Sequence, residues 1–188
     1  MLYGQELDKH YETVHASESE LLELHAHKTG ALIIAGVDLG CDAAQADDAL
    51  CTALQHYAAE LGLVFQIVDD ILDVTATTEE LGKPVGSDAE NDKTTFITLY
   101  GLEGARSLAK QHNDAALAAL ADLGPEADFL REMAVRLEAV AVNGLRTVLL
   151  LGPARPPESG VFRGISSLLP GSFAGNPPVW PGVRRKLP

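Results

Sequence analysis

Apolar residues recur every three or four positions through the middle of the chain. This spacing is typical of one side of a helix and differs from the alternation of a strand. We expect one long helix over residues 43–75, with Gln66, Asp69, Asp70 and Asp73 in its last turns. Asp69 and Asp73 share a face because they are four residues apart, with Gln66 one turn before them. Asp70 is rotated by about 100° from Asp69.

The acidic turn formed by Asp69, Asp70 and Asp73 is the first candidate for chemistry. Like charges four residues apart repel one another, and carboxylates at the negative end of a helix dipole are disfavoured by up to about 1 kcal/mol. A bound cation would offset both effects. Oxygen ligands favour a hard ion such as Mg²⁺, which keeps several waters and completes its shell with substrate phosphates. The alternative is a solvated acidic helix end.

The other periodic segments also predict helices, so the expected fold class is all-α. Ser17 and Glu20 form a capping-box pattern at the start of one helix. The apolar run over residues 31–37 indicates a buried helix that Gly40 ends. The expected helices cover residues 1–8, 17–27, 31–40, 43–75, 101–123 and 126–143, with a short apolar piece over 95–100.

Composition agrees with packed helices in one domain. The chain has 188 residues, 46% of them hydrophobic and only 5% aromatic. A net charge of −13 disfavours nonspecific binding to nucleic acid or to an anionic membrane surface, because like charges repel. Cys41 and Cys51 form neither a metal-binding pattern nor a disulfide framework. No signal peptide or membrane-spanning run is recognised, so we expect a soluble cytoplasmic protein.

The composition changes near residue 150. Residues 1–150 contain 26 acidic and 9 basic residues, whereas residues 151–188 contain one acidic residue and five basic ones. The second segment also holds eight of the ten prolines and has no apolar periodicity. We therefore expect a helical domain over 1–150, followed by an irregular or disordered Pro/Gly-rich tail over 151–188.

Three lysines are candidates for holding an anion. Lys28 adjoins the apolar run over 31–37, so we expect it to point into a cavity or to hold an anion. The alternative is a lysine that extends from a helix end into solvent. Lys83 and Lys93 belong to a glycine- and charge-rich stretch within about 20 residues of the aspartates, which predicts a flap that closes on an anion. An ordinary surface loop is the alternative.

Two histidines precede Lys28. His25 and His27 are two residues apart, so they face different directions on a helix. A metal pair is therefore not expected, and a solvated or packing role is the better interpretation.

Five short motifs occur along residues 1–140. They are Gly4-Gln5-x-x-Asp8, His27-Lys28-Thr29-Gly30-Ala31-Leu32, Phe65-Gln66-x-x-Asp69-Asp70-x-x-Asp73, Gly82-Lys83-x-x-Gly86-x-Asp88 and Lys93-x-Thr95. Together, and in this order and spacing, they resemble the trans-polyprenyl diphosphate synthases, and among them the bacterial farnesyl and geranyl diphosphate synthases. The resemblance implies an incomplete, C-terminal half of the helical isoprenoid synthase fold. It also implies condensation of isopentenyl diphosphate with an allylic diphosphate.

The resemblance also implies roles for individual residues. Asp69 resembles a direct Mg²⁺ ligand, and Asp70 and Asp73 would act through the waters of the metal. Thr29 and Gln66 resemble the polar groups beside the developing allylic cation. The diphosphate-gripping lysines would be Lys28, Lys83 and Lys93. A complete family member is expected to be a homodimer.

The sequence also departs from the family pattern. No first aspartate-rich motif and no upstream glycine–lysine–arginine segment is present, so we expect weak or no turnover by this chain alone. Product length cannot be read. Four interpretations remain open: a synthase portion, a noncatalytic partner subunit, a class I terpene cyclase-like fragment, and a broken gene product without a function. Lys28, Gln66, Asp69 and Lys83 argue against an inert subunit, and Lys93-x-Thr95 does not suit a cyclase.

Overall fold

The computed structural model describes residues 1–77 and 93–144, which form helices and no strands. The chain divides into two units, Met1–Pro156 and Pro157–Pro188, and every described residue belongs to the first. The expected tail over 151–188 lies outside the described residues, so it stays a prediction. The described elements are α1 (Leu2–His10), α2 (Glu18–His25), η1 (Ala26–Gly30), α3 (Ala31–Ala44), α4 (Asp48–Thr75), α7 (Phe96–Ala119), η2 (Pro125–Ala127) and α8 (Asp128–Asn143).

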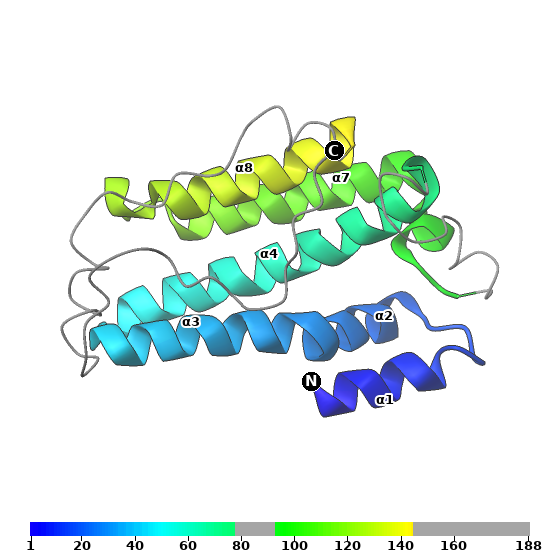
Figure 1. The fold of residues 1–188 in the computed structure, drawn as a ribbon, viewed down its shortest axis with the longest axis horizontal. Coiled ribbons are helices and arrows are strands. Elements are labelled where there is room, and N and C mark those ends of the chain that lie inside the picture. The colour runs from blue at the N-terminus through cyan, green and yellow to red at the C-terminus, as the bar shows by residue number, and fades with distance from the viewer. Residues whose placement is uncertain (78–92, 145–188) are drawn as a thin grey trace, which may run out of the picture. The chain divides into compact units, whose positions relative to one another are not determined.

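Helix α4 is the element around which the others pack. It contacts α7 and α8 on one side and α3 and η1 on the other (Figure 1). Val64, Ile67 and Ile71 in its second half are at most 1% exposed and form the core with residues of α7 and α8. The helix is apolar over most of its surface there because neighbours cover it from several directions.

The long helix begins later than the sequence predicts. Gln45 adopts a left-handed conformation with φ 52° and ψ 42°, which ends α3 and forms the turn before α4. The Asp47 side chain then accepts a hydrogen bond of 2.8 Å from the backbone N–H of Leu50, as an N-cap residue does. The predicted start at residue 43 was therefore wrong, whereas the end at Thr75 is confirmed.

Elements α2, η1 and α3 form one continuous helix rather than two separated ones (Figure 1). The capping box at Ser17 is confirmed, with the Ser17 backbone N–H donating to Glu20 Oε2 at 2.8 Å. η1 is a π-helical turn, a widening that often occurs at functional sites. Gly40 does not end the helix, because a glycine inside a helix costs only about 1 kcal/mol.

The predicted burial of residues 31–37 was also wrong. None of these residues is buried, and Leu32 is 61% exposed. The tertiary contacts of α3 are mainly with α4. One neighbouring helix covers only one side of another, so the rest of the apolar run faces outward.

Backbones approach unusually closely around η1. A Cβ added at Gly4 of α1 would lie 2.3 Å from the backbone nitrogen of Lys28. A Cβ added at Gly62 of α4 would lie 3.3 Å from the Cα of Gly30. The π-helical turn is therefore held between α1 and α4 at distances that side chains larger than hydrogen would not allow without movement.

Helices α7 and α8 complete the described fold. Thr95 caps α7 by accepting a hydrogen bond from Thr98, and Gly101, with φ 67° and ψ 171°, kinks the helix after its first turn. The kink lies at the boundary between the short piece predicted over 95–100 and the helix predicted from residue 101. The helix ends at Ala119, four residues before the predicted end at residue 123, and Pro125 begins the 3₁₀ turn η2. No described helix is both long and apolar enough to cross a membrane.

Candidate active site

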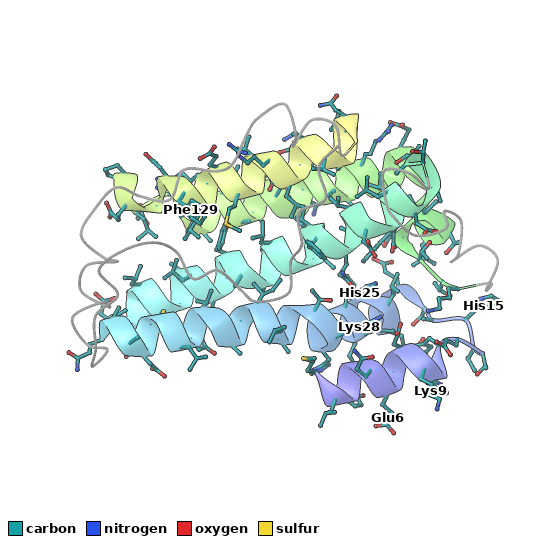
Figure 2. The ribbon with its side chains drawn as sticks, in the orientation of Figure 1. Glu6, Lys9, His15, His25, Lys28 and Phe129 are labelled. Atoms are coloured by element: carbon teal, nitrogen blue, oxygen red, sulfur yellow. The ribbon has the colours of Figure 1, made fainter. Side chains whose placement is uncertain are left out.

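A polar cavity of about 100 Å³ lies among α1, α2, η1, α4 and the residues before α7. In Figure 2, His25 and Lys28 lie close together where α1 packs beside η1. Four of the sequence-predicted residues in the described region line this cavity: Lys28, Gln66, Asp69 and Lys93. The cavity thus unites residues that are far apart in the sequence. Its polar lining residues are Asp8, His25, Lys28, Gln66, Asp69, Lys93, Thr94 and Thr95.

The two described candidate lysines meet the same carboxylate. Lys28 Nζ lies 2.6 Å from Asp8 Oδ2, and Lys93 Nζ lies 4.0 Å from Asp8 Oδ1. Lys93 also lies 3.9 Å from Glu12 Oε1. The prediction that Lys28 points into a cavity is confirmed. Its partnership with Asp8 was not predicted, although Asp8 belongs to the first motif.

The three aspartates of α4 have different surroundings. Asp69 is exposed and lines the cavity. Asp70 is 8% exposed, and its Oδ2 accepts a hydrogen bond of 2.7 Å from the backbone N–H of Phe96. Asp73 is only 2% exposed. Asp70 therefore fastens the start of α7 to the acidic turn.

The donor set fits Mg²⁺ in its chemistry but is incomplete in its geometry. Asp69 offers carboxylate oxygens at the cavity, and such oxygens are what a hard cation prefers. Within residues 1–77 and 93–144, however, no three carboxylate, histidine or cysteine side chains converge as metal ligands do. The described residues thus supply part of a metal site. The predicted joint action of Asp69, Asp70 and Asp73 stays a prediction.

His25 connects the cavity to α7. Its Nδ1 lies 2.9 Å from Gln66 Oε1, and its ring stacks on Phe96 with centroids 5.3 Å apart and planes at 24°. Burial lowers the pKa of His25 to about 4, and the nearby charge of Lys28 also favours the neutral ring. The predicted packing role is confirmed, but the hydrogen bond with Gln66 was missed. His25 and Lys28 are three residues apart, so their side chains lie on one side of a helix. This spacing was the sequence signal that could have placed His25 at the same cavity as Lys28.

Three of the predicted residues that the structure describes do not line the cavity, namely Thr29, Asp70 and Asp73. Thr29 is half-buried. Lys83 lies outside the described residues, as does most of the expected flap. Thr94, next to Lys93, accepts a hydrogen bond of 3.0 Å from the backbone N–H of Ala16, which ties this segment to the start of α2.

A second hollow is apolar. It has a volume of about 390 Å³ and lies among α3, α4 and α8. Phe65 of this groove is 50% exposed and directly precedes Gln66 of the polar cavity. One turn of α4 therefore carries both a polar and an apolar surface. The groove is lined by Ile33, Leu61, Phe65, Met133, Arg136, Leu137 and Val140.

Comparisons with known proteins agree with this arrangement. The family model described as polyprenyl synthetase matches residues 1–124. The chain is 43% identical over 122 residues to the farnesyl diphosphate synthase of Haemophilus influenzae, covering 64% of this chain and 41% of that protein. It is 40% identical over 127 residues to the chloroplastic geranylgeranyl pyrophosphate synthase of Catharanthus roseus, covering 67% of this chain and 36% of the relative.

The chain is also similar to a solved structure, the geranyltransferase of Helicobacter pylori complexed with magnesium and isoprenyl diphosphate. The two chains are 36% identical in sequence and superpose with a TM-score of 0.63. The match covers 77% of this chain and 47% of that one. The chain thus spans less than half the length of these relatives. The likeness confirms the expected helical fold.

Proposed function

Because the chain belongs to the polyprenyl synthetase family, we propose that it supplies the diphosphate-binding side of a prenyltransferase. The enzyme would condense isopentenyl diphosphate with an allylic diphosphate and release pyrophosphate. The observation that carries this proposal is the single cavity shared by Lys28, Lys93, Gln66 and Asp69. Cations and N–H donors around one cavity suit an anion, and a carboxylate beside them suits its counter-cation.

In this reaction the protein must above all stabilise the diphosphate leaving group. When the bond between the allylic carbon and the diphosphate oxygen breaks, negative charge builds up on the diphosphate. The ammonium groups of Lys28 and Lys93 would stabilise that charge because both are already positioned at the cavity. Asp8, which lies 2.6 Å from Lys28, holds this ammonium in place before substrate arrives. Mg²⁺, when bound, would neutralise further charge on the diphosphate.

Asp69 is the described residue best placed to hold that ion directly. It opens onto the cavity, whereas Asp70 is engaged with Phe96 and Asp73 is buried. The carbocation that remains needs apolar surroundings with few oriented polar groups. The exposed ring of Phe65, one residue before Gln66, supports such surroundings on the neighbouring side of α4.

Calorimetry with inorganic pyrophosphate and Mg²⁺ tests the binding part of this proposal. We expect Lys28→Gln to weaken binding by about tenfold, the effect of one charge-assisted hydrogen bond. We expect Asp69→Asn to weaken the Mg²⁺-dependent binding as well, because the ion would lose an anionic oxygen ligand. Lys110→Gln is the matched control, because Lys110 is an exposed lysine of α7 that pairs with Asp114 away from the cavity. Equal affinity of Lys28→Gln and the unsubstituted chain would overturn the proposal.

The catalytic part is tested by condensation of labelled isopentenyl diphosphate with geranyl or dimethylallyl diphosphate. The chain is assayed alone and together with the N-terminal portion of a relative. We expect activity only in the combined sample, since a complete metal set does not form within the described residues. Activity of the chain alone would show that one aspartate-rich turn suffices.

A further inference from the structure

Lys93 lies at the polar cavity although its own side chain makes only long contacts there. Its ammonium group is 4.0 Å from Asp8 Oδ1 and 3.9 Å from Glu12 Oε1, and 26% of the side chain is exposed. Partly exposed ion pairs of this kind contribute only about 0–1 kcal/mol. These contacts do not by themselves fix the ammonium group, so its position depends on what holds the backbone beside it.

The backbone after Lys93 is attached to the rest of the fold at two points. Thr94 Oγ1 accepts a hydrogen bond of 3.0 Å from the backbone N–H of Ala16. Asp70 accepts one of 2.7 Å from the backbone N–H of Phe96, where α7 begins. Before Phe96 this stretch belongs to no helix, and the bond made by Thr94 is the attachment next to Lys93 in the sequence.

Ala16 is a firm partner for this bond. It is 6% exposed and belongs to the same core cluster as Phe96. It also directly precedes Ser17, the N-cap residue of α2. A buried backbone N–H needs an acceptor, because leaving it without one costs about 1–3 kcal/mol. The hydroxyl oxygen of Thr94 supplies that acceptor from 78 residues further along the chain.

The chain segment that Thr94 binds also carries the carboxylate between the two lysines. Asp8 lies in α1, and the chain runs from there through Ala16 to the start of α2. The hydrogen bond of Thr94 therefore joins the backbone beside Lys93 to the segment that carries Asp8. Because Asp8 also binds Lys28 at 2.6 Å, both ammonium groups meet at one carboxylate.

We propose that Thr94 is a positioning residue, which holds the ammonium group of Lys93 at the diphosphate-binding cavity by accepting the backbone N–H of Ala16. This inference rests on the proposed function, because the anion that Lys93 would meet there is the diphosphate. Thr94 acts through Lys93 and needs no contact with the substrate for this role. A hydroxyl group suits the role because its oxygen accepts an N–H, which the methyl group of a valine cannot do.

Calorimetry with inorganic pyrophosphate and Mg²⁺ tests whether Thr94 acts through Lys93. We expect Lys93→Gln to weaken binding by about tenfold, the effect of one charge-assisted hydrogen bond. Thr94→Val should weaken binding by up to the same factor, and the double variant should bind no more weakly than Lys93→Gln alone. A residue that acts through another has no effect once the other is removed, so the two losses should not add. Thr94→Ser keeps the acceptor and should stay within about twofold of wild type.

Thr52→Val is the matched control, because Thr52 is an exposed threonine of α4 whose hydroxyl donates to the Asp48 carbonyl away from the cavity. Wild-type affinity of Thr94→Val, or additive losses in the double variant, would overturn the inference. If Lys28→Gln weakens binding and Thr94→Val does not, the inference fails while the proposed function stands. A wild-type chain that binds no pyrophosphate would overturn the proposed function and the inference with it.

Amide hydrogen exchange of the wild-type chain tests the same coupling without a variant, so it decides even if Thr94→Val does not fold. The Ala16 amide should be protected, and pyrophosphate with Mg²⁺ should slow its exchange further, because coupling between two contacts is reciprocal. The control is the Leu50 amide, which likewise donates to a side chain, that of Asp47, and should not respond. An unprotected Ala16 amide would overturn the inference alone, since that result involves no pyrophosphate. An Ala16 amide that does not respond to bound pyrophosphate would overturn it as well.

Discussion

A methyl group at Gly4 should separate α1 from η1. The Cβ of alanine there would lie 2.3 Å from the backbone nitrogen of Lys28 and 2.5 Å from the carbonyl carbon of His27. Non-bonded carbon atoms prefer about 3.5–4.0 Å, so one backbone must move by roughly 1 Å or more. Neither contact is a side chain that could rotate away. Such overpacking typically costs about 1–3 kcal/mol, against a gain of up to about 1 kcal/mol from the better helix propensity of alanine.

We therefore expect Gly4→Ala to lower the free energy of unfolding by about 1–2 kcal/mol, measured by urea unfolding followed by circular dichroism. Gly36→Ala is the control, because Gly36 lies in α3 and a Cβ there would meet nothing within 4 Å. It should raise the same free energy by up to about 1 kcal/mol.

A second result follows from the position of Asp8 on the same helix. Movement of α1 would lengthen the 2.6 Å contact between Asp8 and Lys28, so Gly4→Ala should also change pyrophosphate affinity while Gly36→Ala should not. If Gly4→Ala unfolds at the same or a higher urea concentration than the unsubstituted chain, the close approach of the two backbones does not exist and the reasoning fails.

Three further predictions concern pH and two buried polar contacts. The pKa of His25 is about 4 in the folded chain against 6.5 when unfolded, so the unfolded chain takes up the proton first. The corresponding stability, about 3 kcal/mol, is present above pH 6.5 and is lost as the pH falls towards 4. Urea unfolding of wild type and His25→Phe at pH 7 and 4.5 checks this, and equal losses would contradict it. Asp70→Ala should lower the free energy of unfolding by about 1–3 kcal/mol, because the backbone N–H of Phe96 loses its acceptor. Asp70→Asn keeps an oxygen acceptor and should cost less, so equal melting temperatures of the two variants would contradict the role of this hydrogen bond. Arg131→Ala should cost about 2 kcal/mol, since its guanidinium donates to three backbone carbonyls after α7, and an unchanged urea midpoint would refute this.

Local periodicity was sufficient for the helical class and for the acidic turn. The spacing of apolar residues in α4 reflects the 3.6-residue turn of a helix, so it can be recognised in the sequence without knowing which helices pack against α4. Glu20 lies only three residues after Ser17, and the capping box could be recognised for the same reason. These features depend on neighbours in the sequence.

The parts that were missed depend on distant residues. Asp70 binds the backbone of Phe96, 26 residues later, and His25 meets Gln66, 41 residues later. Neither partner leaves a periodic signal. The outward face of α3 was missed because apolar composition shows what a helix could bury, while the number of neighbouring helices determines what it does bury.

The π-helical turn at η1 sets the angular phase of the whole α2–η1–α3 helix. An α-helix advances about 100° per residue, so one additional residue in a turn rotates everything before it by about a quarter of a circle relative to a regular helix. With this offset Leu21 and Leu24 are buried and His25 reaches Gln66. Loss of one residue in this turn would swing all three away while leaving α3 in place. The length of the turn is therefore constrained independently of its composition.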